Sequence, residues 1–158
     1  MRLLSGLLLG IVAGMRSFSG PAAAAIAARR NHDQFARRFS GNLPAILQAL
    51  AIAELVADKL PFVPDRRKPP AFAWRMISGA VSAAAVTGED DSLALAALVG
   101  GAGAVAGTFG GAALRSRLAE VFGHDLPAAL VEDVAAIAIA LLAERSLRAA
   151  EPRLLAAA

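Results

Sequence analysis

The chain contains no cysteine, and this absence removes several kinds of chemistry at once. Without thiols there can be no disulfide, no thiolate ligand for a metal and no thiol nucleophile. The two histidines, His32 and His124, stand alone, without a second ligand at metal-binding spacing. A nucleophile elbow and a phosphate-binding loop are also missing from the sequence. We therefore predict no metal and no cofactor, and a role other than catalysis is favoured.

Charged and aromatic residues are scarce as well, at 18% and 5% of the 158 residues. Because the basic residues are not interleaved with aromatic ones, we expect no nucleic-acid partner. Hydrophobic residues, in contrast, make up 57% of the chain, whereas soluble domains contain about 45–50%. This composition predicts an all-α, polytopic membrane protein. We expect a single membrane domain over residues 1–158, located in the cell inner membrane and surrounded by lipid.

The apolar runs predict about five helical segments, because a span needs about 20 residues. The expected segments are 3–28, 43–60, 72–87, 93–114 and 126–147. Pro21 is expected to break the first segment, since proline removes a backbone donor inside a helix. Two connections stand out by composition, a basic interfacial loop at 29–42 and a proline-rich basic loop at 61–71.

Two of these segments carry a glycine at every fourth position. The glycines are Gly6, Gly10 and Gly14 in the first segment, and Gly103, Gly107 and Gly111 in the fourth. A spacing of four places them on one helix face, where another backbone can approach closely. We predict that the first and fourth segments pack together through these glycine strips.

The segments that follow the glycine strips are also alike. Each opens with Leu-Pro-Ala, at Leu43 and at Leu126, and each carries a pair of carboxylates. Segments one and two therefore resemble segments four and five, with the third segment between them. Such an arrangement predicts an inverted-topology repeat, in which the first and fourth segments cross in opposite directions.

Arg16 follows the first glycine strip at a depth where an unpaired arginine costs at least about 2.5 kcal/mol. Its candidate partners are the carboxylates of the second and fifth segments, namely Glu54, Asp58, Glu132 and Asp133. By spacing, Asp58 and its neighbour Lys59 lie near the end of the second segment, which indicates the interface. Arg75 and Trp74, at the entry of the third segment, are expected to be interface anchors.

These residues also carry a family resemblance. The elements that carry it are Gly14-Met-Arg16 with Pro21, Glu54-Leu-Val-Ala-Asp58-Lys59-Leu-Pro61 with Asp65, Arg75 with Gly79, and Glu132-Asp133. Together they resemble the bacterial DUF4126 family of membrane proteins. The resemblance implies an integral membrane protein without specifying an activity, and it makes Asp58, Lys59 and Asp65 functional candidates.

Three functions remain open at this point. The first is a small transporter or permease that binds an ion or a small anionic substrate through Arg16, Glu54, Asp58, Lys59, Glu132 and Asp133. The second is a lipid-interacting scaffold or lipid-modifying protein that acts at the headgroup interface. Its expected residues are Asp58, Lys59, Asp65 and Arg66, with Arg75 also at the interface. The third is a structural oligomer, in which the same charges only join helices. In each case we expect self-association, as a homodimer.

Overall fold

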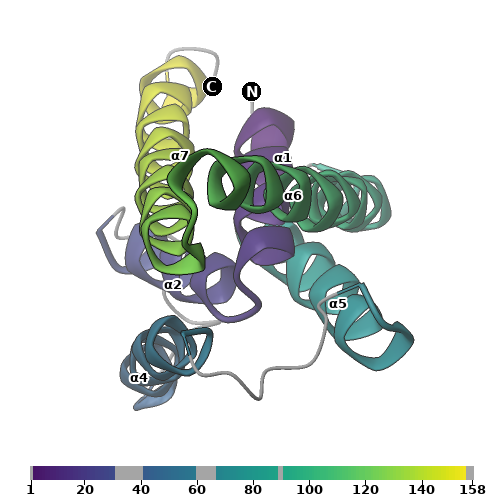
Figure 1. Ribbon diagram of the computed structural model, residues 1–158. Helices are drawn as coiled ribbons and strands as arrows, with labels where there is room; N and C mark the ends of the chain where they lie inside the picture. The colour runs from purple at the N-terminus through teal and green to yellow at the C-terminus, as the bar shows by residue number, and fades with distance from the viewer. Residues whose placement is uncertain (1, 31–40, 60–66, 89–90, 156–158) are drawn as a thin grey trace.

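The computed structural model describes residues 2–30, 41–59, 67–88 and 91–155, and this part of the chain is helical throughout its regular structure (Figure 1). The helices are α1 (Arg2–Met15), α2 (Ser19–Arg30), α4 (Leu43–Ala57), α5 (Pro69–Ala85), α6 (Leu93–Phe122) and α7 (Asp125–Leu155). The all-α prediction is therefore confirmed for the described residues. Most of the basic loop and residues 60–66 of the proline-rich loop lie outside them.

The first predicted segment is two helices joined by a tight turn. The chain leaves α1 after Met15 and enters α2 at Ser19, so the break precedes Pro21. Proline then stands in the first turn of α2, where its missing N–H does no harm. A Cβ atom built on Gly20 would lie 2.7 Å from Ala13 Cβ, because α2 folds back against α1. Residues 2–30 thus form a helical hairpin.

α5 returns along α1 in the opposite direction, and α6 then packs on both. Gly10, Gly79 and Gly100 meet where the three helices cross, and a Cβ on Gly79 would lie 2.7 Å from the Gly100 carbonyl oxygen. Glycine is required here because a side chain would separate the backbones. Further along, Gly14 lies against Ala104. Later residues of α1 therefore contact later residues of α6, which means that the two helices run in the same general direction.

This shared direction bears on the predicted repeat. An inverted repeat needs the first and fourth segments to run in opposite directions, whereas α1 and α6 run in the same direction. The five-segment scheme and the inverted repeat are therefore not confirmed.

The later helices are longer than predicted. α5 begins at Pro69, inside the stretch predicted as a loop, because proline suits the first turn of a helix. α6 opens with Ser92, whose hydroxyl accepts from Leu95 N, and continues past Arg115 to Phe122. Gly123 then takes a left-handed conformation, with φ of 70°, and reverses the chain into α7.

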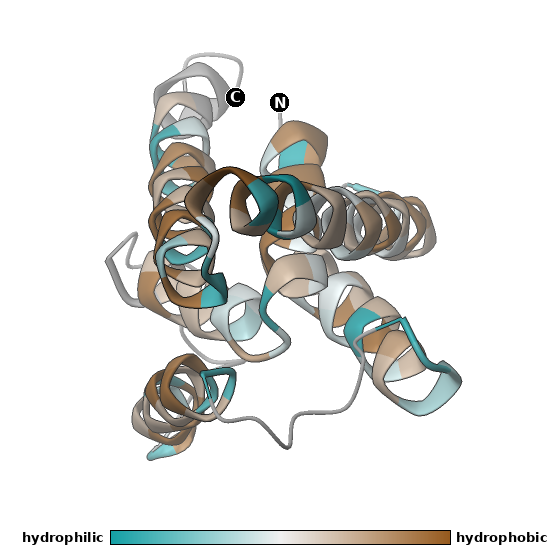
Figure 2. Cartoon of the chain, viewed as in Figure 1, coloured by the Kyte–Doolittle hydropathy of each residue, from teal (hydrophilic) through white to brown (hydrophobic). Residues whose placement is uncertain are grey.

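Burial is reversed from the usual soluble pattern. Apolar side chains lie on the outside of the helices, including Leu98 at 72% and Val134 at 68% exposed, while Arg16 and Glu132 are fully buried. Figure 2 shows the apolar colour along the outer sides of α6 and α7. Two described helices are long and apolar enough to cross a membrane, Leu93–Phe122 and Asp125–Ala149.

Candidate functional site: a buried ion cluster at the tip of a helical hairpin

Arg16 occupies the tip of the α1–α2 hairpin, and its side chain is 0% exposed. Its guanidinium forms close ion pairs with Asp58 from the end of α4 and Asp133 from α7. A third carboxylate, Glu132, lies 3.9 Å from Arg16 Nη2. The tip of the hairpin thus brings α4 and α7 together through charge.

Two further cations complete this cluster. Lys59 Nζ lies 2.6 Å from Asp133 Oδ2. Arg115 of α6 lies 3.6 Å from Asp58 Oδ2 and 3.6 Å from Glu132 Oε2. We call these six residues, Arg16, Asp58, Lys59, Arg115, Glu132 and Asp133, the ion cluster. Each of its three carboxylates faces a cation, so that no uncompensated charge is buried. Arg115 also pairs outside the cluster with the exposed Asp125, whose Oδ2 lies 2.5 Å from Arg115 Nη2.

Glu54 has a different place from the one expected for a partner of Arg16. Its carboxylate accepts hydrogen bonds from Ser17 N at 2.6 Å and Phe18 N at 2.9 Å. In a continuous helix these two N–H groups would donate to the carbonyls four residues earlier, those of Ala13 and Gly14. Glu54 therefore satisfies the donors that the helix break leaves free, next to the N-terminus of α2, where negative charge is favourable.

The helix break also leaves the carbonyl oxygen of Gly14 without its partner in α1, and side chains of other helices donate hydrogen bonds to it. Gly14 O accepts from Arg75 Nη1 at 3.0 Å and from Thr108 Oγ1 at 3.1 Å. Arg75 Nη2 also lies 3.7 Å from Glu54 Oε1. The prediction of Arg75 as an interface anchor is therefore wrong, because the residue is only 6% exposed, whereas its neighbour Trp74 is 49% exposed. Arg75 instead helps to hold the break open.

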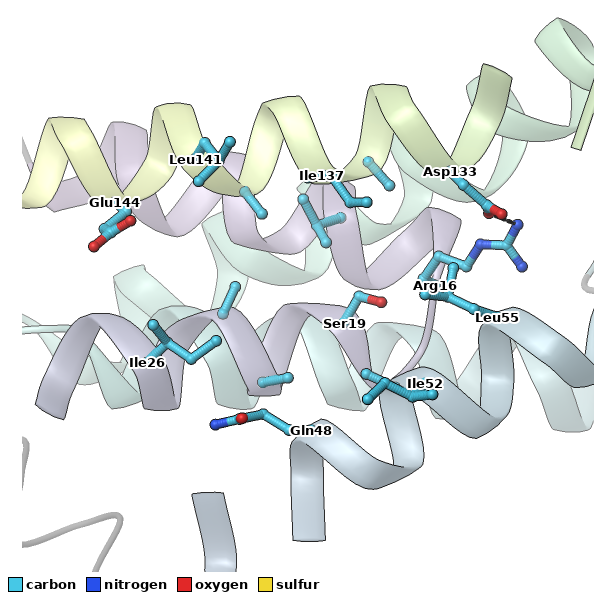
Figure 3. A pocket seen from close by; sticks show the side chains of 16 residues that line it. Arg16, Ser19, Ile26, Gln48, Ile52, Leu55, Asp133, Ile137, Leu141 and Glu144 are labelled. Atoms are coloured by element: carbon cyan, nitrogen blue, oxygen red, sulfur yellow. Dashed lines mark hydrogen bonds and ion pairs between the residues drawn. The ribbon is translucent and has the colours of Figure 1, made fainter. Parts of the chain in front are cut away.

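A pocket of about 340 Å³ extends from the ion cluster along the hairpin. Its walls come from α1, α2, α4 and α7, and Figure 3 shows Arg16 and Asp133 together at one end and Glu144 at the other. Between these ends the lining is mostly apolar, with Ile26, Ile52, Ile137 and Leu141 among its members, and Ser19 and Gln48 are its polar residues.

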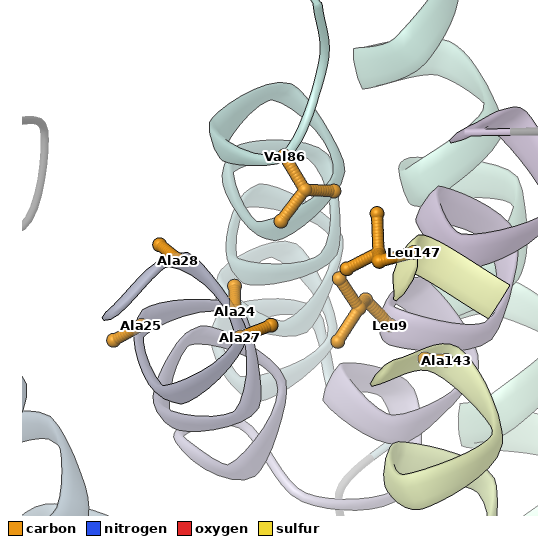
Figure 4. Close-up of a cluster of buried hydrophobic side chains, with 8 residues drawn as sticks. All are labelled: Leu9, Ala24, Ala25, Ala27, Ala28, Val86, Ala143 and Leu147. Atoms are coloured by element: carbon orange, nitrogen blue, oxygen red, sulfur yellow. The ribbon is translucent and has the colours of Figure 1, made fainter. Parts of the chain in front are cut away.

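Apolar contacts close the fold beside the far end of this pocket. Leu9 of α1, alanines of α2, Val86, and Ala143 and Leu147 of α7 form a buried cluster (Figure 4). Four alanines of α2 belong to it, at positions 24, 25, 27 and 28. Such small side chains allow α2 to pack closely against α1, α5 and α7.

The structure thus assembles five of the six predicted binding residues in one cluster and places Glu54 beside it. Asp58 and Lys59 both turn toward the cluster, because the Asp58 side chain is 9% exposed and the Lys59 ammonium pairs with Asp133. Their position near a membrane interface stays a prediction. Asp65 and Arg66 lie outside the described residues.

Among the predicted packing glycines, Gly10 and Gly14 lie against α6, and Gly103 and Gly107 lie against α1. Gly6 instead faces Ala83 of α5, at 3.1 Å from a built Cβ, and Gly111 is buried in α6.

Sequence reasoning missed Arg115. The signal was present, because Arg115 continues the four-residue spacing of Gly103, Gly107 and Gly111 and so lies on the same face of α6.

The fold and the site define a class of all-helical protein in which a balanced ion cluster is buried at a hairpin tip and the outer surface is apolar. Within this class the chain belongs to the DUF4126 family, described as a domain of unknown function, whose model matches residues 3–145. The predicted family is therefore confirmed. No curated protein and no solved structure matches the chain.

Proposed function

We propose that this protein is a small permease of the cell inner membrane, with the ion cluster as its site for an ion or small anionic substrate. The reversed burial supports a bilayer placement, because exposed leucines and valines suit lipid, whereas Arg16 and Glu132 are kept inside. Charged residues at membrane depth mark substrate or ion pathways by default. In this placement α6 and α7 cross the bilayer.

The hairpin is the second support for transport. α1 has 14 residues, which corresponds to about 21 Å of helix, shorter than the roughly 30 Å hydrocarbon core. The hairpin therefore ends inside the proposed membrane, with Arg16 at its tip. Broken helices that place charged groups at depth are the usual binding sites of secondary transporters.

We infer that α4 is the moving part. It packs on α2, and its connections to the hairpin tip and α7 are polar. These connections are Glu54 to Ser17 and Phe18, Asp58 to Arg16, and Lys59 to Asp133. A proton or a substrate that competes for these groups would loosen α4, whereas an apolar interface would not respond. Residues that bind substrate would thus also hold the gate.

The observation that carries the proposal is that Asp58 and Lys59, at the end of α4, both hold α4 in place and belong to the ion cluster. A conformational test can use cysteine pairs cleanly, because the chain has no cysteine of its own. Val56→Cys on α4 and Val134→Cys on α7 are both exposed and do not line the pocket. Spin labels on this pair in liposomes should give two distance populations, and Glu54→Gln should enrich the longer one.

Transport itself can be measured by capacitive currents on solid-supported membranes after rapid exchange to acetate, phosphate, chloride or a different pH. We expect a protein-dependent current that Arg16→Gln abolishes. Arg117→Gln is the matched control, because Arg117 is exposed on α6, and should keep the current. A single distance between the two spin labels, unchanged in Glu54→Gln, together with no current for any probe, would reject the permease. A static structural protein would then remain.

A further inference from the structure

We propose that the pocket beside the ion cluster binds a single-chain fatty acid, which enters from the side between α4 and α7. This inference rests on the proposed function and names the substrate class of the same site. It goes beyond a site for small ions, because the pocket extends well past the charged groups.

The shape and lining of the pocket match one alkyl chain. Asp133 and Glu144, at its two ends, are eleven residues apart on α7, which corresponds to roughly 16–17 Å of helix. Most of the side chains that line the space between them are apolar, with Ser19 and Gln48 as the polar exceptions (Figure 3). Its volume of about 340 Å³ lies at the small end of the usual ligand range of about 300–1,000 Å³. One chain fits this space, and a second chain would remain outside.

The side entrance follows from residues that are both lining and exposed. Ile52 of α4 is 63% exposed, and Ile137 and Leu141 of α7 are 53% and 50% exposed, although all three line the pocket. They therefore form its rim on the outer, apolar surface of the molecule. In the proposed placement this rim faces lipid, from which a fatty acid would arrive.

The head end needs a hydrogen-bond acceptor and not a charge. Arg16 Nε is a buried donor with no partner among the described residues, and Arg16 lines the pocket. An unsatisfied buried donor costs about 1–3 kcal/mol. Each carboxylate of the ion cluster already faces a cation, and Arg115 is paired with the exposed Asp125 as well. The carbonyl oxygen of the protonated, uncharged acid would satisfy Nε, while the apolar chain would lie along Ile137 and Leu141.

The test is photolabelling of the full-length protein in nanodiscs with a fatty acid that carries a diazirine in its chain. We expect labelled peptides from the pocket walls of α2 and α7, with competition by unmodified fatty acid. Ala140→Phe, which fills the lining, should reduce this labelling by roughly tenfold, as expected for an overpacked site. Ala138→Phe is the matched control, because Ala138 is exposed on the same helix and does not line the pocket.

Other results would overturn the proposal. Labels spread over the outer faces of α4 and α7, or labelling unchanged in Ala140→Phe, would mean ordinary lipid contact. Pocket labelling by a two-chain phospholipid analogue and not by the fatty acid would reassign the occupant to bilayer lipid.

The outcomes also separate the two proposals. Currents with acetate or phosphate but no pocket label would keep the permease and reject the fatty acid. Pocket labelling with an immobile α4 and no current for any probe would support the ligand and reject transport.

Discussion

At the scale of single residues, Arg16 has the largest electrostatic effect on the fold. Removing its charge leaves Asp58 and Asp133 with fewer partners inside the protein, which is costly because buried unpaired charges are poorly solvated. Arg16→Gln should lower the free energy of unfolding by about 3–5 kcal/mol, the range for a broken buried pair. Unfolding in mixed micelles would measure this loss. Arg117→Gln should change it little.

The double variant Arg16→Gln/Asp58→Asn tests whether charge balance explains this cost. It leaves Lys59 paired with Asp133 at 2.6 Å and Arg115 beside Glu132 at 3.6 Å. Each remaining carboxylate of the cluster then keeps a cation, so that the double variant should be more stable than Arg16→Gln alone. A coupling energy of about 0.5–3 kcal/mol is expected for groups in contact. Losses that simply add would contradict the balanced cluster.

Glu54 gives a second residue-scale prediction. Glu54→Gln keeps an acceptor but loses the negative charge beside the N-terminus of α2, which costs up to about 2 kcal/mol in partly buried sites. The amide protons of Ser17 and Phe18 should then exchange faster with solvent, because Glu54 accepts from both. Hydrogen exchange by mass spectrometry would show this at the hairpin tip. Glu120→Gln, on an exposed position of α6, should leave the same amides unchanged.

At this scale the sequence identified most residues of the ion cluster, but it did not show which cation pairs with which carboxylate. Spacing showed that Arg16 needed a carboxylate and which helices could supply one. It could not show that Glu54 binds backbone N–H groups, because those donors become free only when the helix breaks before Pro21. Nor could it place Arg75, whose role depends on the Gly14 carbonyl from the same break.

At the scale of helices, the contact between α1 and α6 makes a sharp prediction. A Cβ on Gly107 would overlap the carbonyl oxygen of Ile11, whereas a Cβ on Gly110 would meet nothing within 4 Å. Gly107→Ala should therefore lower the free energy of unfolding by about 1–3 kcal/mol through overpacking. Gly110→Ala should raise it by about 0.5–1 kcal/mol, because alanine favours a helix.

Thermal unfolding of these two variants would check the contact, since they differ only in the face of α6 that they change. Equal behaviour of the two would show that the helices do not approach closely at Gly107. The sequence predicted which helices carry close-packing faces from a spacing of four. It did not reveal that Gly79 and Gly100 join Gly10 at the crossing, because neither belongs to a spaced strip in its own helix.

At the scale of the whole molecule, the hairpin changes how the chain relates to the proposed bilayer. Five spans would place Leu3 and Asn42 on opposite sides. In the structure, α1 and α2 form a hairpin, and α4 then leads from the base of that hairpin to its tip, where Asp58 meets Arg16. The start of α1 and the start of α4 should therefore face the same side. The expected homodimer stays a prediction that crosslinking in native membranes would test.

Single cysteines can decide between these topologies, because the native chain has none to interfere. Leu3→Cys, Asn42→Cys and His124→Cys replace side chains that are exposed. In inside-out and right-side-out vesicles, a membrane-impermeant maleimide should label Leu3→Cys and Asn42→Cys from the same side. His124→Cys, in the turn between α6 and α7, should react from the other side. Labelling of Leu3→Cys and Asn42→Cys from opposite sides would mean that residues 2–30 cross the bilayer once, and Arg16 would then lose its place at a hairpin tip.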